Sequence, residues 1–130
     1  MIPALVLILT SLSIFTFLLQ AVLPKGTRRH IIQGFLPGIF AISSIVINTA
    51  WVHSTRGLVL DPPFILHMIL GLGFVAAWAA SCKTGIHLLW QKKEASRKYH
   101  RRMFVIQGIL LAVTILLGIG MPYLRSLLRS

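Results

Sequence analysis

Five histidines are the residues of this sequence whose type and position could do chemistry. They are His30, His53, His67, His87 and His100, and each stands near the end of an apolar segment. Imidazole is a common ligand of haem iron and of other metals. A titratable ring on a membrane-spanning segment is costly, so it counts as a functional-site hypothesis. The alternative for each histidine alone is a ring that lies among lipid headgroups or caps a helix.

The spacing of His67 and His87 matches the thickness of a membrane. The two lie on one apolar segment, and a helix between these positions would separate them by about 30 Å, roughly the hydrocarbon core of a bilayer. One histidine is therefore expected at each membrane face. Small residues (Gly73, Ala76 and Ala80) lead towards His87, and they would admit either a neighbouring helix or a flat macrocycle.

Two histidines from facing helices could clamp a haem iron, as four-helix bundles commonly do. His53 and His67 flank a short loop, which predicts an outer pair at one depth. The inner site has three candidates for two places. His87 is the first choice and His100 the second. His30 is the third, and it could instead serve a haem propionate or a quinone headgroup.

Composition excludes most other classes of function. The chain has 130 residues, of which 56% are hydrophobic, and a formal net charge of +11. Its basic residues gather between apolar runs, a pattern typical of membrane topology rather than nucleic-acid binding. Asp61 and Glu94 are the only carboxylates, so paired acid–base catalysis is excluded. The single Cys82 cannot form an internal disulfide. A zinc or copper site of clustered histidines stays open on the cytoplasmic side.

The apolar runs predict an all-α protein, an integral membrane four-helix bundle forming one domain over residues 1–130. The expected helices cover residues 2–23, 30–52, 63–90 and 100–123, and Pro37-Gly38 is expected to kink the second. A short internal repeat supports a plan of two hairpins. Arg28 to Gly34 reads RRHIIQG and Arg102 to Gly108 reads RMFVIQG, at equivalent places near the starts of the second and fourth helices.

Orientation follows from the lysines and arginines. Ten of the thirteen lie in the first and third loops or at Lys83. The positive-inside rule therefore predicts that these two loops are cytoplasmic and that both termini lie on the opposite side of a bacterial inner membrane.

Several motifs together resemble the small bacterial membrane b-type cytochromes, the cytochrome b561-like four-helix haem proteins. They are His67-Met-Ile-Leu-Gly71, His87-Leu-Leu-Trp90, Arg97-Lys-Tyr-His100 and Leu116-Leu-Gly118. The resemblance implies one or two b haems that pass electrons across the membrane or to and from quinone.

The expected function is therefore electron relay for a redox partner protein or a quinone pool, as a subunit rather than a stand-alone enzyme. The alternative is a cofactor-free accessory or assembly subunit of a larger membrane complex. On that view the histidines are interfacial and the glycines are helix-packing positions.

Overall fold

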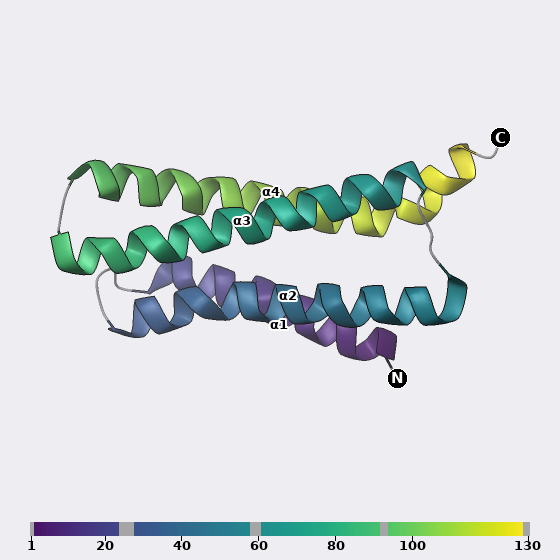
Figure 1. Ribbon diagram of the computed structural model, residues 1–130, viewed down its shortest axis with the longest axis horizontal. Coiled ribbons are helices and arrows are strands. Elements are labelled where there is room, and N and C mark those ends of the chain that lie inside the picture. The colour runs from purple at the N-terminus through teal and green to yellow at the C-terminus, as the bar shows by residue number, and fades with distance from the viewer. Residues whose placement is uncertain (1, 24–27, 58–60, 92–93, 129–130) are drawn as a thin grey trace.

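The protein is a bundle of four α-helices, seen in a computed structural model that describes residues 2–23, 28–57, 61–91 and 94–128. The helices are α1 (Ile2–Val22), α2 (Arg28–Arg56), α3 (Pro62–Gln91) and α4 (Glu94–Leu127). They run up and down in sequence, so that both ends of the chain lie at one end of the bundle (Figure 1). Each helix contains a stretch that is long and apolar enough to cross a membrane. The predicted all-α class with four helices is confirmed.

Several helix boundaries differ from the expected ones, and α4 continues past Pro122 to Leu127. At three of the boundaries polar residues extend or fix the helix. The last turn of α2 continues to Arg56, where Ser54 and Thr55 bond back to the carbonyl of Trp51 at 2.9 and 2.8 Å. Gly57 then ends the helix with a φ of 72°, a conformation that glycine adopts at no steric cost. The carboxylate of Asp61 caps α3 by accepting the N–H of Phe64 at 2.9 Å. At its start, α4 includes six residues before position 100.

The bundle consists of two hairpins, α1 with α2 and α3 with α4, and contact within each hairpin is more extensive than contact between them. Hydroxyl groups join the first hairpin. Thr10 and Ser44 are hydrogen-bonded at 2.8 Å, and Ser13 donates to the backbone carbonyl of Pro37 at 2.8 Å. Ser44 is buried, so this polar residue of α2 faces another helix rather than the exterior.

Two aromatic contacts join the hairpins. The indole N–H of Trp78 donates to the carbonyl of Gly34 at 2.9 Å, and the ring lies so close to Gly38 that only glycine leaves room for it. Phe17 of α1 stacks on Phe104 of α4, with ring centroids 4.7 Å apart and an interplanar angle of 13°. These contacts fix how the interior faces of all four helices meet.

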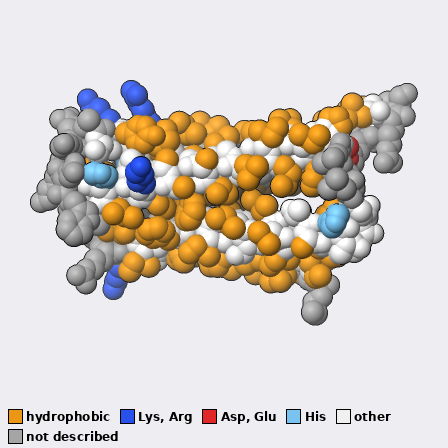
Figure 2. All heavy atoms as spheres, viewed as in Figure 1, with side chains coloured by type: hydrophobic (Ala, Val, Ile, Leu, Met, Phe, Trp, Pro, Cys, Tyr) orange, Lys and Arg blue, Asp and Glu red, His pale blue; other side chains and the backbone are white. Residues whose placement is uncertain are grey.

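The exterior of the bundle is more apolar than its interior. Large apolar side chains are exposed on every helix, and Figure 2 shows them covering the middle of one face. Several fully buried residues are polar: Ser13, Thr16, Gln20, Ser44, Ser81 and Gln107. Such an arrangement suits a lipid-facing exterior, because lipid solvates apolar groups and leaves polar groups to pair inside.

The two ends of the bundle differ in charge. Exposed basic side chains surround the end where α2 and α4 begin, namely Arg29, Lys83, Arg97, Lys98, Arg101 and Arg102. This end is called the basic end below. The opposite end, which holds both chain termini, is called the terminal end.

Candidate functional site

His100 is the best anchored of the five histidines. Its ring is half-buried near the basic end, with Nδ1 at 3.0 Å from the backbone oxygen of Ser81 and 3.1 Å from Oγ1 of Thr84. A carbonyl oxygen only accepts, so in the neutral ring Nδ1 carries the proton and Nε2 holds the lone pair. Metal-binding histidines commonly have this arrangement, in which a backbone carbonyl orients the ring. Gly85 also leaves room for the ring, because a Cβ there would lie 3.3 Å from Cε1 of His100.

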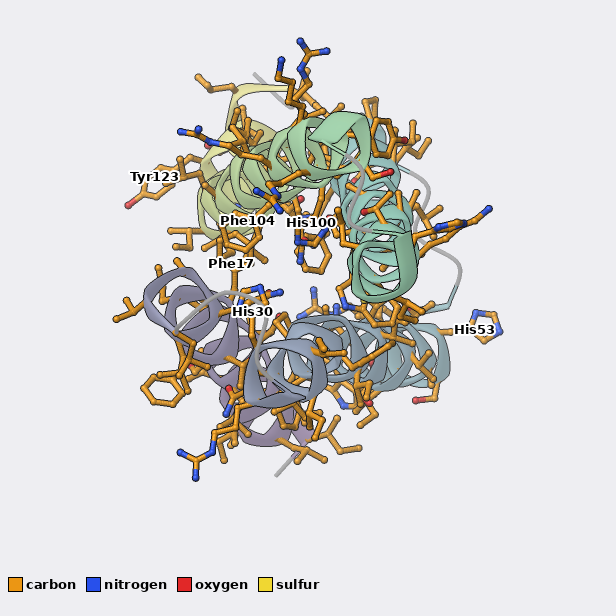
Figure 3. All side chains as sticks on the ribbon, turned by 90° about the vertical axis from the view of Figure 1, so that its left-hand side faces the viewer. Phe17, His30, His53, His100, Phe104 and Tyr123 are labelled. Carbon is orange, nitrogen blue, oxygen red and sulfur yellow. The ribbon has the colours of Figure 1, made fainter. Side chains whose placement is uncertain are left out.

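His30 approaches the same interior region from α2. Viewed from the basic end, His30 and His100 both project towards the space between the hairpins (Figure 3). The ring of His30 is half-buried, and its Nδ1 is fully buried.

Helix register places His30 and His100 at similar depths. Gly34 contacts both Trp78 and Cys82, so it is level with the stretch of α3 between them. His30 lies one turn before Gly34 on α2. Because α3 runs in the opposite direction, His30 is level with a point one turn further along α3, at about Thr84. Thr84 is a hydrogen-bond partner of His100. The second and third choices for the inner site therefore face the same region between the hairpins at similar depths.

His87 lies apart from this interior region. His87 is exposed because of the rotation of α3 about its axis. Phe74, Ala77 and Ser81 form the buried face of this helix, whereas Ala76 and His87 are exposed. Bulky Phe74 thus lies in the interior. Of the stripe of small residues, which was expected to admit a neighbouring helix or a macrocycle, Gly73 lies against Leu110 of α4. The pairing of His87 with His100 stays a prediction that this rotation of α3 does not favour.

The two histidines at the terminal end are also separated by their orientation. His67 is half-buried against α4, where a Cβ on Gly118 would lie 3.1 Å from its Cε1. Its Nδ1 is buried and has no hydrogen-bond partner among the described residues. His53 is exposed in the last turn of α2 and points away from the bundle (Figure 3). The predicted outer pair of His53 and His67 therefore stays a prediction without support from this geometry.

Four further polar residues lie in the interior near His30 and His100, one from each helix. They are Gln20 of α1, Gln33 of α2, Ser81 of α3 and Gln107 of α4, and they are called the polar layer below. Each has a buried side-chain atom with no hydrogen-bond partner among the described residues. The residue pattern did not lead to a prediction of this layer. Its available signal was the Gln-Gly pair shared by the two repeats, at Gln33 and Gln107.

The glycine of each Gln-Gly pair admits a side chain from α1. A Cβ on Gly34 would lie 2.8 Å from Nε2 of Gln20, and one on Gly108 would lie 3.1 Å from the ring of Phe17. The repeats thus place equivalent residues of α2 and α4 against the first helix.

A multi-ligand metal centre has no support in the part of the chain that the structure describes. No group of three or more histidine, cysteine or acidic side chains there could hold a metal ion. This tells against a zinc or copper site of clustered histidines, whereas axial haem ligation needs only two rings.

Comparisons with known proteins did not identify a relative of this chain. No protein-family model matches the chain, and searches of curated proteins and of solved structures found no match.

Proposed function

We propose that this protein is a membrane electron-transfer protein that binds a b-type haem between His30 and His100. One observation carries the proposal: Nδ1 of His100 is held by the carbonyl of Ser81, while His30 faces the same region and lies at a similar depth by helix register. When bound, the haem supplies one-electron chemistry, and the protein contributes binding, orientation and electrostatics.

The residues around the two rings fit such a group. The two histidines come from different helices, as clamping an iron from both sides requires. Gly85 keeps α3 from crowding the His100 ring. Arg97 and Arg101 are exposed near the same end, where guanidinium groups could pair with carboxylates. The surrounding helices restrict water, which with the nearby positive charge would tune the potential.

The proposed setting is a bacterial inner membrane. All four helices would span it, with the basic end in the cytoplasm and both termini outside. A haem-binding bundle of four membrane helices is what the resemblance to the cytochrome b561-like proteins implies. Electrons would pass to or from a quinone or a redox partner protein.

The proposal includes a second haem at the terminal end, which has less geometric support than the first. His67 is half-buried against α4 there, but His53 points away from the bundle and would have to turn inwards to complete a pair. If a second haem binds, His67→Ala removes it and leaves the haem at the basic end in place. Haem quantified per chain in that variant measures the effect.

The inner pair is tested by haem content in single variants. His30→Ala and His100→Ala should each abolish the bis-histidine b-type spectrum of the purified protein. His87→Ala is the matched control, since it removes an exposed histidine near the same end. Loss of haem in His87→Ala with retention in His30→Ala would assign the site to His87 and His100 instead.

A further inference from the structure

The polar layer is unusual because three of its four members are deeply buried, whereas Gln33 is half-buried. Gln107 is 1% exposed, Ser81 4% and Gln20 6%. Buried polar groups are nearly always hydrogen-bonded, and leaving one unpaired costs about 1–3 kcal/mol. Unpaired polar groups contributed by all four helices therefore indicate a partner other than the described residues.

Contacts around the bundle keep the layer together. Gln20 reaches the backbone of α2 at Gly34, next to Gln33. Gly34 in turn accepts hydrogen bonds from Trp78 and Cys82, which flank Ser81 on α3. Gln107 precedes Gly108 on α4. Gly108 lies against Phe17 of α1, which is one turn before Gln20. The layer thus spans about two helical turns, next to His100 on its membrane side.

The chemistry of the layer fits an uncharged ligand that has two oxygen atoms. Its unpaired atoms are the amide oxygens of Gln20 and Gln33, the amide nitrogen of Gln107 and the hydroxyl of Ser81. An amide offers both donors and acceptors, so this set can serve a carbonyl as well as a hydroxyl. All four members are uncharged, which disfavours a carboxylate or phosphate ligand. Flat aromatic groups border the layer at the Phe17–Phe104 stack.

We propose that the polar layer binds the headgroup of a quinone or its quinol. The carbonyl oxygens of a quinone accept hydrogen bonds from Gln107 and Ser81, and the hydroxyls of a quinol donate to Gln20 and Gln33. The polar layer lies one or two helical turns from the proposed haem site. A quinone bound there would therefore exchange electrons with the haem, a role that rests on the proposed function. Binding itself does not require the haem.

The test is calorimetric titration of the purified full-length protein in detergent with ubiquinone-1. Gln107→Leu keeps the side-chain size and removes the amide, so its Kd should rise about tenfold, the effect of one lost hydrogen bond. Ser81→Ala should weaken binding in the same direction, and it serves if Gln107→Leu fails to fold. Thr114→Val is the matched control, because the Thr114 hydroxyl lies two turns further along α4 and bonds to Leu110 of its own helix at 2.6 Å.

The outcomes separate this proposal from the haem proposal. Binding that Gln107→Leu and Ser81→Ala weaken but Thr114→Val preserves supports the quinone site, even in protein without haem. Absence of binding, or equal Kd values in all variants, overturns it. A shifted haem spectrum in quinone-free Gln107→Leu with an unchanged Kd would place the amide against the haem, and that result also overturns the proposal.

Discussion

At the scale of single residues, the difference between His87 and His100 lies in their partners. Both stand near the basic end, and both are flanked by basic residues. Only His100 meets a carbonyl that fixes its ring, because it packs against the inward face of α3. An exposed imidazole keeps its water and its rotamer freedom, so it offers no preorganised position for iron.

The first residue-scale prediction concerns Thr84. Its hydroxyl lies 3.1 Å from Nδ1 of His100 and helps to hold the ring, so Thr84→Val should weaken haem binding about tenfold. Haem transfer to apomyoglobin measures the affinity. Thr55→Val is the control, since that exposed hydroxyl bonds only to its own helix. Equal transfer in the two variants would show that Thr84 does not support the ligand.

At the scale of helices, the sequence predicted the number of elements but not their rotation. Long apolar runs identify membrane helices because the hydrocarbon thickness sets their length. Rotation has a weaker signal, since large apolar residues stand at lipid-facing and helix-facing positions alike. On α3, Phe74 is buried and Leu72 is exposed, although both are large apolar residues. This is why the choice between His87 and His30 could not be made from spacing.

Helix ends were missed for a different reason. The expected ends followed the apolar runs, but backbone bonding continues through polar residues. Serine and threonine bond back to the carbonyls at the end of α2, and lysine and arginine are good helix formers at the start of α4. His53 therefore lies within a helical turn that directs it outwards, rather than in a loop beside His67.

The contact between α2 and α3 gives an element-scale prediction. A methyl group on Gly38 would overlap the ring of Trp78, so Gly38→Ala should destabilise the bundle by about 1–3 kcal/mol. Thermal unfolding in detergent measures the loss. Gly120→Ala is the control, because no atom lies within 4 Å of its added Cβ. A Gly38→Ala protein as stable as Gly120→Ala would contradict the packing of Trp78 against α2.

At the scale of the whole molecule, charge and polarity are sorted in two directions. Polar groups lie inside and apolar groups outside, whereas basic groups gather at one end. The first arrangement suits lipid around the bundle, and the second predicts its orientation. On the proposed orientation, the haem and quinone sites would lie in the half of the membrane nearer the cytoplasm.

The proposed orientation is testable by labelling. In a Cys82→Ser background, Ser54→Cys at the terminal end should react with a membrane-impermeant maleimide in intact cells. Lys98→Cys at the basic end should react only after the membrane is permeabilised. Both positions are exposed, so access depends on the side of the membrane rather than on burial. The reverse pattern would place the basic end outside the cell.

The measurement that most directly tests the central claim is a reduced-minus-oxidised visible spectrum of the detergent-purified protein, with haem quantified per chain. The account predicts a b-type spectrum with at least one haem per chain. It also predicts that this haem persists when His53, His67 and His87 are all replaced by alanine. A colourless protein after expression with adequate haem supply would contradict the account and favour a cofactor-free subunit of a larger membrane complex.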